Sequence, residues 1–468
     1  MSRLIVVSNR VSMPEANQPS SGGLAVGVQA ALQDSGGIWF GWNGNTCATL
    51  SPPTEIESHG NIQLATMALN EADFELYYNG FSNSSLWPIL HYLIGFFKFE
   101  RQAFEAYWRV NSFFAERLLP LIEPDDIVWV HDYHLIPLAC ELREAGVQNA
   151  LGFFLHVPFP AYDMLRVLPV HRSLLRALCL FDVVGFQTEM DRDNFMDAAA
   201  RSGMGVERVD ECTLRMNGHE CRADVYPIGI DVDGVARLAE QARQHADFRR
   251  LVDSLVGREL LIGVDRLDYS KGLEARFRAY ERLLSKYPTH RLAVTYMQIA
   301  PPTRTGVRAY DEIRSELEQV SGNINGRFAT TDWVPLRYLN AGLDRTRLMG
   351  VLRAARVGLV TPVRDGMNLV AKEFIASQDP ADPGMLVLSS LAGSAVELEA
   401  AVLVNPYDTE DMADGMAQAL AMPLAERRER YRAMLEVLRR DDITNWRQRF
   451  VADLQAAGER RTAAEQLD

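Results

Sequence analysis

Short apolar runs alternate with longer helical patterns along almost the whole chain. Examples are Leu4–Ser8, Ile127–His131 and Leu151–His156 in the first half, and Leu260–Val264 and Val357–Thr361 in the second. The runs are continuously apolar, which indicates strands that are buried on both faces. Such strands belong to parallel sheets covered by helices. The sequence therefore predicts two doubly wound α/β domains, one on each side of the middle.

The predicted boundary between these domains lies at Tyr226–Asp231, where proline and glycine follow a short strand. We expect an N-terminal domain over residues 1–231 and a C-terminal domain over residues 232–440. The remaining stretch, about 441–468, is amphipathic, and we expect it to pack back on the first domain. Within the second domain, the pattern predicts a helix over Val307–Val320 and then a strand over Gly326–Thr331.

Charge and composition exclude several classes of protein. The chain has 48 Lys and Arg against 62 Asp and Glu, a net charge of −14, which argues against a nucleic-acid or membrane-surface partner. The longest apolar stretch, Leu86–Phe97, contains Pro88 and is too short to span a bilayer, and Leu4–Val7 is too short for a signal-peptide core. Five scattered cysteines form no CxxC pair. We expect a reduced, cytoplasmic protein without a structural metal.

In the first domain, polar residues follow two predicted strands, at the edge where doubly wound sheets bind ligands. Asp132 could accept hydrogen bonds from sugar hydroxyls, whereas His131 and His134 beside it are as readily structural. His156 precedes a segment with two prolines, which would hold its imidazole rigidly. A sugar-binding site at this edge is the hypothesis that these residues support.

Two further features of the first domain leave alternatives open. Gly22 and Gly23 precede a helix start, where backbone N–H groups can bind an anion, but they could equally form a flexible turn. Tyr78 and Trp87 lie in irregular, aromatic-rich segments. Such rings stack on sugar faces, although most aromatic residues belong to cores.

In the second domain, Arg266 and Lys271 lie in one turn after the strand Leu260–Val264 and directly before a helix. Two cations beside a helix N-terminus suit a diphosphate leaving group, whose growing charge they would stabilise. The alternative is a set of surface salt bridges to Asp265 and Asp268.

A second turn of this kind follows the strand Val357–Thr361. Gly366 permits a tight turn beside Asp365, and the backbone N–H groups of Asn368–Val370 could face a phosphate. Glu373 could accept the two hydroxyls of a ribose, or it could be an exposed residue of a capped helix. Residue chemistry alone thus predicts an enzyme with two domains that handles a sugar and a nucleoside diphosphate.

Several longer strings resemble those of the retaining trehalose-6-phosphate synthase family. They occur in the family's order from residue 3 to about 450, and they are VVSNR, SGGLAVG, FGWNG, YYNGFSNSSLWP, VWVHDYHL, GFFLHVPFP, GFQTE, VYPIGID, DRLDYSKGL, QIAPPTR, RDGMNLVAKE and NPYD. The resemblance implies a GT-B fold, in which two doubly wound domains face each other across the active-site cleft. It also implies retaining transfer of glucose from UDP-glucose to glucose 6-phosphate, without a metal or cofactor.

The resemblance further assigns roles to single residues. The acceptor, glucose 6-phosphate, would be bound by Arg10, Tyr78, Trp87, Asp132 and Arg304, with the two arginines on its phosphate. The donor would be bound by Gly22, Gly23, His156, Arg266, Lys271, Leu343, Asp365, Gly366, Met367, Asn368, Leu369, Val370 and Glu373. The catalytic residues among these would be Arg266, Lys271, Asp132, His156 and Asp365. Arg10 and Arg304 are identified by the resemblance alone.

The resemblance implies a front-face mechanism, in which the acceptor hydroxyl attacks the face that the nucleotide leaves. The departing phosphate would take the acceptor proton, so no protein nucleophile is needed. A retaining glycosidase would instead need two placed carboxylates and would leave Arg266 and Lys271 without a role. The product, α,α-trehalose 6-phosphate, would pass to a separate phosphatase, because no DxD nucleophile of a fused phosphatase follows. Trehalose synthesis of this kind serves osmoprotection, and we expect a homo-oligomer, a dimer or a tetramer.

Three alternatives share the same fold. Leu343 stands where some members have an aromatic residue beside the nucleobase, which leaves uracil, guanine and adenine open as the donor base. Another phosphorylated acceptor, such as glycerol 3-phosphate or a cyclitol phosphate, would use the same donor site. A non-catalytic sugar-phosphate sensor would have lost Arg266, Lys271 or Glu373, and all three are present.

Overall fold

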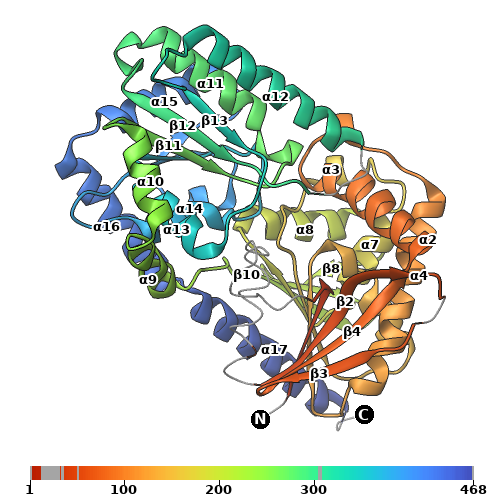
Figure 1. Cartoon of the computed structure of the whole chain (residues 1–468). Helices are drawn as coiled ribbons and strands as arrows, with labels where there is room; N and C mark the ends of the chain where they lie inside the picture. The colour runs from red at the N-terminus through yellow and green to blue at the C-terminus, as the bar shows by residue number, and fades with distance from the viewer. Residues whose placement is uncertain (1–2, 12–31, 33–35, 50–51, 304–307, 466–468) are drawn as a thin grey trace. The chain divides into compact units, whose positions relative to one another are not determined.

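The computed structural model describes residues 3–11, 32, 36–49, 52–303 and 308–465 (Figure 1). The described residues form two compact units. The first comprises those up to Ile228 and those from Ile443 onward, and the second comprises Gly229–Asp442. The expected boundaries were residues 231 and 440. No helix among the described residues is both long enough and apolar enough to cross a membrane.

Among its described residues, the first unit contains one sheet with the strand order β3-β4-β2-β1-β5-β6-β7-β10-β9-β8. Its central strands pair in parallel, whereas β3, β9 and β8 are antiparallel additions at the edges. Counted along the chain, the first six parallel strands lie in the order 3-2-1-4-5-6, which is that of the Rossmann fold. The strands are β1 (Leu4–Arg10), β2 (Gly37–Cys47), β3 (Glu55–His59), β4 (Ile62–Asn70), β5 (Ile127–His131), β6 (Ala150–Phe154), β7 (Val183–Phe186), β8 (Glu207–Arg208), β9 (Thr213–Met216) and β10 (His219–Val225).

The helices of the first unit include one of unusual geometry, a π-helical segment over Glu75–Leu86 in the aromatic-rich region. The pattern did not predict it, because its wider turn breaks the 3.6-residue period. The other helices are α2 (Glu71–Phe74), α3 (Trp87–Leu90), α4 (Arg101–Leu118), α5 (Leu138–Glu144), α6 (Tyr162–Leu165), α7 (His171–Leu178), α8 (Glu189–Arg201) and α17 (Ile443–Glu465). Short 3-10 turns lie at Ile94–Phe96, Leu119–Leu121 and Tyr133–Leu135.

The second unit contains a parallel sheet with the order β13-β12-β11-β14-β15-β16, again 3-2-1-4-5-6 along the chain. Helices α11, α12 and α15 form one layer, and α9, α10, α13, α14 and α16 form another (Figure 1). The strands are β11 (Glu259–Val264), β12 (Val294–Ile299), β13 (Leu336–Leu339), β14 (Val357–Val360), β15 (Met385–Ser389) and β16 (Val402–Val404). The helices are α9 (Val232–Ala242), α10 (Ala246–Leu255), α11 (Leu273–Lys286), α12 (Arg308–Phe328), α13 (Arg345–Ala354), α14 (Leu369–Ser377), α15 (Thr409–Ala421) and α16 (Leu424–Arg440), with 3-10 turns at Tyr269–Lys271, Pro288–His290 and Gly393–Val396. Two doubly wound sheets are what the apolar runs predicted.

The predicted strand over Gly326–Thr331 is wrong. Helix α12 continues to Phe328, and the strand of this region is β13. Leu317 and Ile324, spaced two turns apart, are fully buried and keep the helix against the core. A Cβ atom at Gly326 would meet open space, so this glycine lies on the solvent side of the last turn and does not end the helix.

The C-terminal helix α17 packs on strands β5, β6 and β7 of the first unit. The ring of Phe450 stacks on Trp129, with centroids 4.6 Å apart. The helix comes close because Gly152 and Gly185 have no side chain. A Cβ atom at either glycine would lie 2.8 Å from the Phe450 ring.

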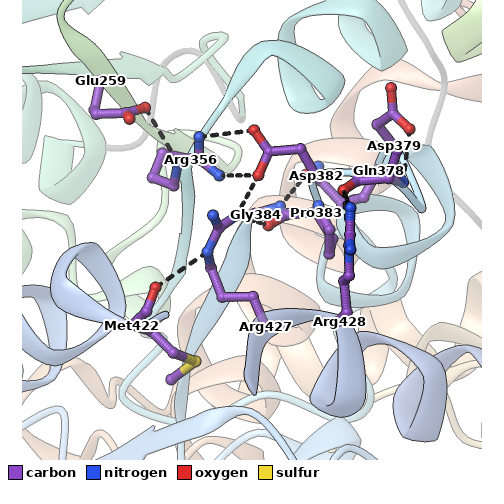
Figure 2. A network of polar contacts seen from close by, with 11 residues as sticks. Glu259, Arg356, Gln378, Asp379, Asp382, Pro383, Gly384, Met422, Arg427 and Arg428 are labelled. Atoms are coloured by element: carbon purple, nitrogen blue, oxygen red, sulfur yellow. Dashed lines mark hydrogen bonds and ion pairs between the residues drawn. The ribbon is translucent and has the colours of Figure 1, made fainter. Parts of the chain in front are cut away.

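An arginine cluster ties together the amino-terminal edge of the second sheet (Figure 2). Arg356 bonds both carboxylate oxygens of Asp382, at 2.9 and 3.1 Å, and Arg427 bonds the same carboxylate at 2.8 Å. Hydrogen bonds from Arg356, and then from Arg427, lower the pKa of Asp382 to about 2. These arginines are compensated within the fold, and they lie at the edge opposite to that where doubly wound sheets bind ligands.

At the carboxyl edge of the same sheet, Arg276 on α11 is completely buried. Its guanidinium pairs with Asp265 after β11, donates to Gln298 of β12 at 3.0 Å, and donates to Thr361 after β14 at 2.8 Å. It also donates to the backbone carbonyl of Lys271 at 3.3 Å. One side chain thus joins the ends of three strands and a turn.

We predict that Arg276→Met lowers the free energy of unfolding by about 3–5 kcal/mol, because it leaves the Asp265 carboxylate buried without its counter-charge. Urea unfolding followed by circular dichroism measures this change. Arg278→Met, on the exposed face of the same helix, is the control, and the loss of its surface pair with Glu274 should cost less than about 1 kcal/mol. Equal effects of the two substitutions would contradict the assignment.

Candidate active site

In a doubly wound sheet, ligands bind beyond the carboxyl ends of the strands, where the strand order reverses. In the first unit this point lies between β1 and β5, and in the second unit between β11 and β14. The first position carries Arg10 and Asp132, and the second carries Arg266, Lys271 and Asp365. The strand-end residues singled out in the sequence therefore fall at the expected edge within each unit.

The predicted acceptor residues of the first unit stand among aromatic rings. Arg10, exposed at the end of β1, lies 5.8 Å from the centroid of the Trp42 ring. Tyr78 stacks between Phe74 and His134, with centroids 5.2 and 5.6 Å away. These contacts hold the Tyr78 ring in one orientation.

The Trp87 side chain is buried, whereas a ring that stacks on a sugar needs an exposed face. It is 3% exposed and packs on His91, with ring centroids 4.0 Å apart, and on Tyr133 at 5.8 Å. Its contact with the acceptor ring stays a prediction. Gly22, Gly23 and Arg304 lie outside the described residues.

Asp132 directly follows β5 in a strained backbone conformation, with φ 74° and ψ 163°. Non-glycine residues rarely adopt a positive φ, and such strain gathers at functional sites. The side chain is held in place, because Oδ1 accepts a hydrogen bond from the backbone N–H of His156 at 3.3 Å. The two predicted sugar-binding residues of this unit are therefore neighbours.

His156 is a neutral imidazole. Burial lowers its pKa to about 3, and burial together with His156 lowers the pKa of His131 well below its usual value. Nε2 of His156 lies 3.0 Å from Nδ1 of His131. The two imidazoles offer hydrogen bonds to sugar hydroxyls and carry no positive charge.

The turn of the second unit that carries Arg266 and Lys271 is charged, unlike the neutral imidazoles of the first unit. Lys271 is 9% exposed, and its ammonium group pairs with the carboxylate of Asp365. Arg266 is exposed. Asp265 pairs with buried Arg276, and Asp268 accepts the backbone N–H of Ser270 at 3.0 Å. Lys271 is thus held by the second predicted donor loop, which follows β14.

That donor loop, Asp365–Asn368, is organised around the Asp365 carboxylate. Besides Lys271, it accepts the N–H of Gly366 at 3.1 Å and the side-chain amide of Asn368 at 2.9 Å. Asn368 has φ 70° and caps α14, which begins with Leu369 and Val370. The first N–H groups of any helix have no acceptor inside it, so this end can face a phosphate.

Gly393 packs against the backbone of the donor loop. Its N–H donates to the carbonyl of Asp365 at 3.2 Å, and the N–H of Ser394 donates to the carbonyl of Met367 at 2.9 Å. A Cβ atom at Gly393 would lie 1.7 Å from the carbonyl oxygen of Gly366. Only glycine permits this approach, which holds the donor loop against the core.

Glu373 lies one turn into α14 and is 8% exposed. Burial raises its pKa, and Arg345, 3.2 Å away, opposes the rise and favours the carboxylate. Arg345 is a residue that sequence reasoning missed, although it follows Leu343 and Asp344 at the start of α13. Leu343 is partly buried and packs against the core of the second unit.

The chain matches the model of glycosyltransferase family 20 over residues 2–456. It belongs to this family. A trehalose-6-phosphate synthase of Klebsiella pneumoniae is 51% identical over 97% of this chain and 95% of its own. An α,α-trehalose-phosphate synthase (UDP-forming) of Burkholderia xenovorans, solved in complex with glucose 6-phosphate, is 49% identical and superposes with a TM-score of 0.93 over 97% of this chain and 100% of its own.

A structure from E. coli bound with UDP-2-fluoro glucose is 47% identical to this family 20 chain, with a TM-score of 0.93 over 97% of this chain and 99% of that one. The resemblance read from the sequence strings is confirmed. So is the GT-B fold class, with its two Rossmann-like sheets.

The pairing of Arg345 with Glu373 predicts a dependence of stability on pH. Without the guanidinium, the folded-state pKa of Glu373 rises further above its unfolded value of about 4.3. A carboxyl group with a raised folded pKa contributes its stability at low pH and loses it as the pH rises through that pKa. Arg345→Gln should therefore destabilise the protein more at pH 8, by about 1–3 kcal/mol, than at pH 5.

Urea unfolding at the two pH values measures this difference. Arg347→Gln is the control on the same helix, because Arg347 pairs with Asp247 and Asp344 at the surface. Loss of these exposed surface pairs should cost the same at both pH values. A pH-independent loss for Arg345→Gln would refute the proposed electrostatic role.

Proposed function

We propose that this family 20 member is a retaining glucosyltransferase that moves glucose from UDP-glucose to glucose 6-phosphate. The products would be α,α-trehalose 6-phosphate and UDP. The observation that carries the proposal is the pair of turns at the switch point of the second unit. There Lys271 is linked to Asp365, and Glu373 lies one turn into the following helix. The named ligands of the relatives, glucose 6-phosphate and UDP-2-fluoro glucose, supply the acceptor and the donor.

The donor would be held by groups of three kinds. Arg266 and Lys271 would bind the diphosphate, together with the N-terminus of α14 at Leu369 and Val370. Lys271 has three donors, so it can hold a phosphate oxygen and keep its bond to Asp365. Glu373 would accept the ribose hydroxyls, for which its carboxylate form is required. The Leu343 segment would border the base.

The acceptor would be held by the first unit. Arg10 and Arg304 would bind the 6-phosphate beside Tyr78, and Asp132 and Trp87 would hold the ring. The Asp132 carboxylate is held by the backbone N–H of His156, and carboxylate oxygens are hydrogen-bond acceptors of the kind that sugar hydroxyls need. His156 and Asp365 would bind the transferred glucose through its hydroxyls.

The proposed transfer needs no protein nucleophile. The acceptor hydroxyl attacks the anomeric carbon on the face that the diphosphate leaves, and the leaving phosphate oxygen takes the hydroxyl proton. Arg266 and Lys271 stabilise the charge that develops on this oxygen as the glycosidic bond breaks. Neutral His156 and the aromatic surroundings of Tyr78 suit the uncharged sugar.

We propose the cytoplasm as the site of action, because the five cysteines are free thiols, as is usual in reducing compartments. The product would be consumed by a separate trehalose-6-phosphate phosphatase. Family resemblance supports a homo-oligomer, a dimer or a tetramer.

The test incubates the purified chain with glucose 6-phosphate and UDP-, GDP- or ADP-glucose, and follows nucleotide release and the anomeric configuration of the product. We expect UDP and the α,α-linked disaccharide phosphate. Lys271→Met should lower kcat on the order of 100–1000-fold, since it removes a group that stabilises the leaving diphosphate. Lys286→Met, at the exposed end of the following helix, should leave kcat unchanged. Binding of both substrates without UDP release would indicate a sensor.

A second prediction concerns the acceptor phosphate. Arg304→Ala and Arg10→Ala should each raise the KM for glucose 6-phosphate by about 10–100-fold, the effect of losing a hydrogen bond to a charged group. The KM for UDP-glucose should change far less. Steady-state kinetics with each substrate varied in turn separates the two constants. Equal increases in both would remove these arginines from the phosphate site.

A further inference from the structure

Two histidines of the first unit form a direct pair, and only one of them, His156, has a role in the proposed mechanism. His131 ends β5 and His156 follows β6, the neighbouring parallel strand. Nδ1 of His131 lies 3.0 Å from Nε2 of His156, and the ring centroids are 5.3 Å apart. At this distance, one proton lies between the two nitrogens.

Each ring carries one proton, because burial lowers the pKa of both imidazoles far below neutrality. A neutral imidazole has one N–H donor and one bare acceptor nitrogen. Only two arrangements give a hydrogen bond. Either His131 donates from Nδ1 to His156, or His156 donates from Nε2 to His131.

The surroundings of Nε2, the other ring nitrogen of His131, decide between these two arrangements. His131 is completely buried, and no described residue hydrogen-bonds its Nε2. The neighbouring rings are those of Trp129, at 4.6 Å, and of Trp446 on the C-terminal helix α17, at 6.3 Å. Among backbone groups, a buried N–H without an acceptor is rarer than a buried acceptor without a donor, and burying an unpaired imidazole N–H carries the same kind of cost. The proton of His131 therefore lies on Nδ1, where it has a partner.

The same reasoning fixes the proton of His156. Its Nε2 accepts from His131, so its own proton lies on Nδ1. No described residue hydrogen-bonds that nitrogen, and His156 is not fully buried. The side chain thus presents an N–H donor to a ligand.

We propose that His131 is a positioning residue that fixes the tautomer of His156, so that His156 donates from Nδ1–H to a hydroxyl oxygen of the transferred glucose. The contact with glucose rests on the proposed function. The tautomer itself is a property of the free protein. His131 acts through His156 and does not contact substrate.

The chain offers a matched pair of variants for the test. His131→Asn places an amide donor near the position of Nδ1, whereas His131→Leu has a similar size and no donor. ¹⁵N spectra of histidine-labelled protein report the tautomer, and the signals of His156 are those missing from His156→Gln. We expect the Nδ1–H tautomer of His156 in the wild type and in His131→Asn, and a growing Nε2–H population in His131→Leu.

The kinetic constants of the variants should change in parallel with the tautomer of His156. His131→Leu should lower kcat/KM for UDP-glucose about tenfold, as expected for one misplaced hydrogen bond, and leave the KM for glucose 6-phosphate unchanged. His131→Asn should stay within about threefold of the wild type. Trp446→Phe, which alters the aromatic wall without touching either nitrogen, should lower the melting temperature and leave the tautomer unchanged.

Three results would overturn the proposal: the Nε2–H tautomer of His156 in the wild type, wild-type kcat/KM in a folded His131→Leu, or equal losses in His131→Leu and His131→Asn. The wild-type spectrum decides even if the leucine variant does not fold. A wild-type protein that releases no UDP would instead refute the proposed function, and the spectrum would still test the tautomer.

Discussion

The arrangement of the strand ends in the second unit depends on the buried ion pair between Arg276 and Asp265. A guanidinium buried away from solvent needs hydrogen-bond partners within the fold, and those of Arg276 come from the ends of β11, β12 and β14 and from the carbonyl of Lys271. These ends surround the point where the strand order reverses. The position of the Lys271 turn is therefore fixed by two contacts, one from the buried Arg276 side chain to the Lys271 carbonyl and one from the Asp365 carboxylate to the Lys271 ammonium group. A cation held in this way needs little rearrangement to meet a developing negative charge, which is the condition for strong electrostatic catalysis.

The two units have sheets with the same order of parallel strands, but the residues at their binding edges differ in chemical character. Around Asp132 and His156 the first unit places aromatic rings and neutral imidazoles, which suit the hydroxyls and faces of a sugar. The second unit places paired charges, Lys271 with Asp365 and Arg345 with Glu373, where a diphosphate and a ribose would bind. In each case the character follows from burial. Desolvation keeps the histidines neutral, whereas in the second unit an opposite charge lies beside each carboxylate.

How far the sequence predicted this site depended on where each residue stood. Asp132 directly follows one apolar run and Lys271 lies in the turn after another, so strand ends located both. Arg276 was missed because an arginine within an apolar helical stripe normally extends to solvent, and only the folded sheet shows its three partners. The strand predicted at Gly326–Thr331 failed for a related reason, since the burial of Ile324 overrides the local preference of the glycine and threonines. Arg10 and Arg304 carry no local signal, and only the family strings identified them.

Positive backbone φ angles occur in the segment after the fourth strand of each sheet. In the 3-2-1-4-5-6 order, β5 and β14 are each the fourth strand; Asp132 directly follows β5, Asn368 ends the donor loop that follows β14, and both have positive φ. Such a conformation costs about 1–3 kcal/mol and persists only where hydrogen bonds enforce it. The enforcing bonds here are those of the carboxylates themselves. Asp132 accepts from the backbone of His156, and Asp365 accepts from the side chain of Asn368. Backbone strain and the position of a carboxylate are thus coupled in both segments. Each coupled carboxylate lies at the edge of the sheet where ligands bind.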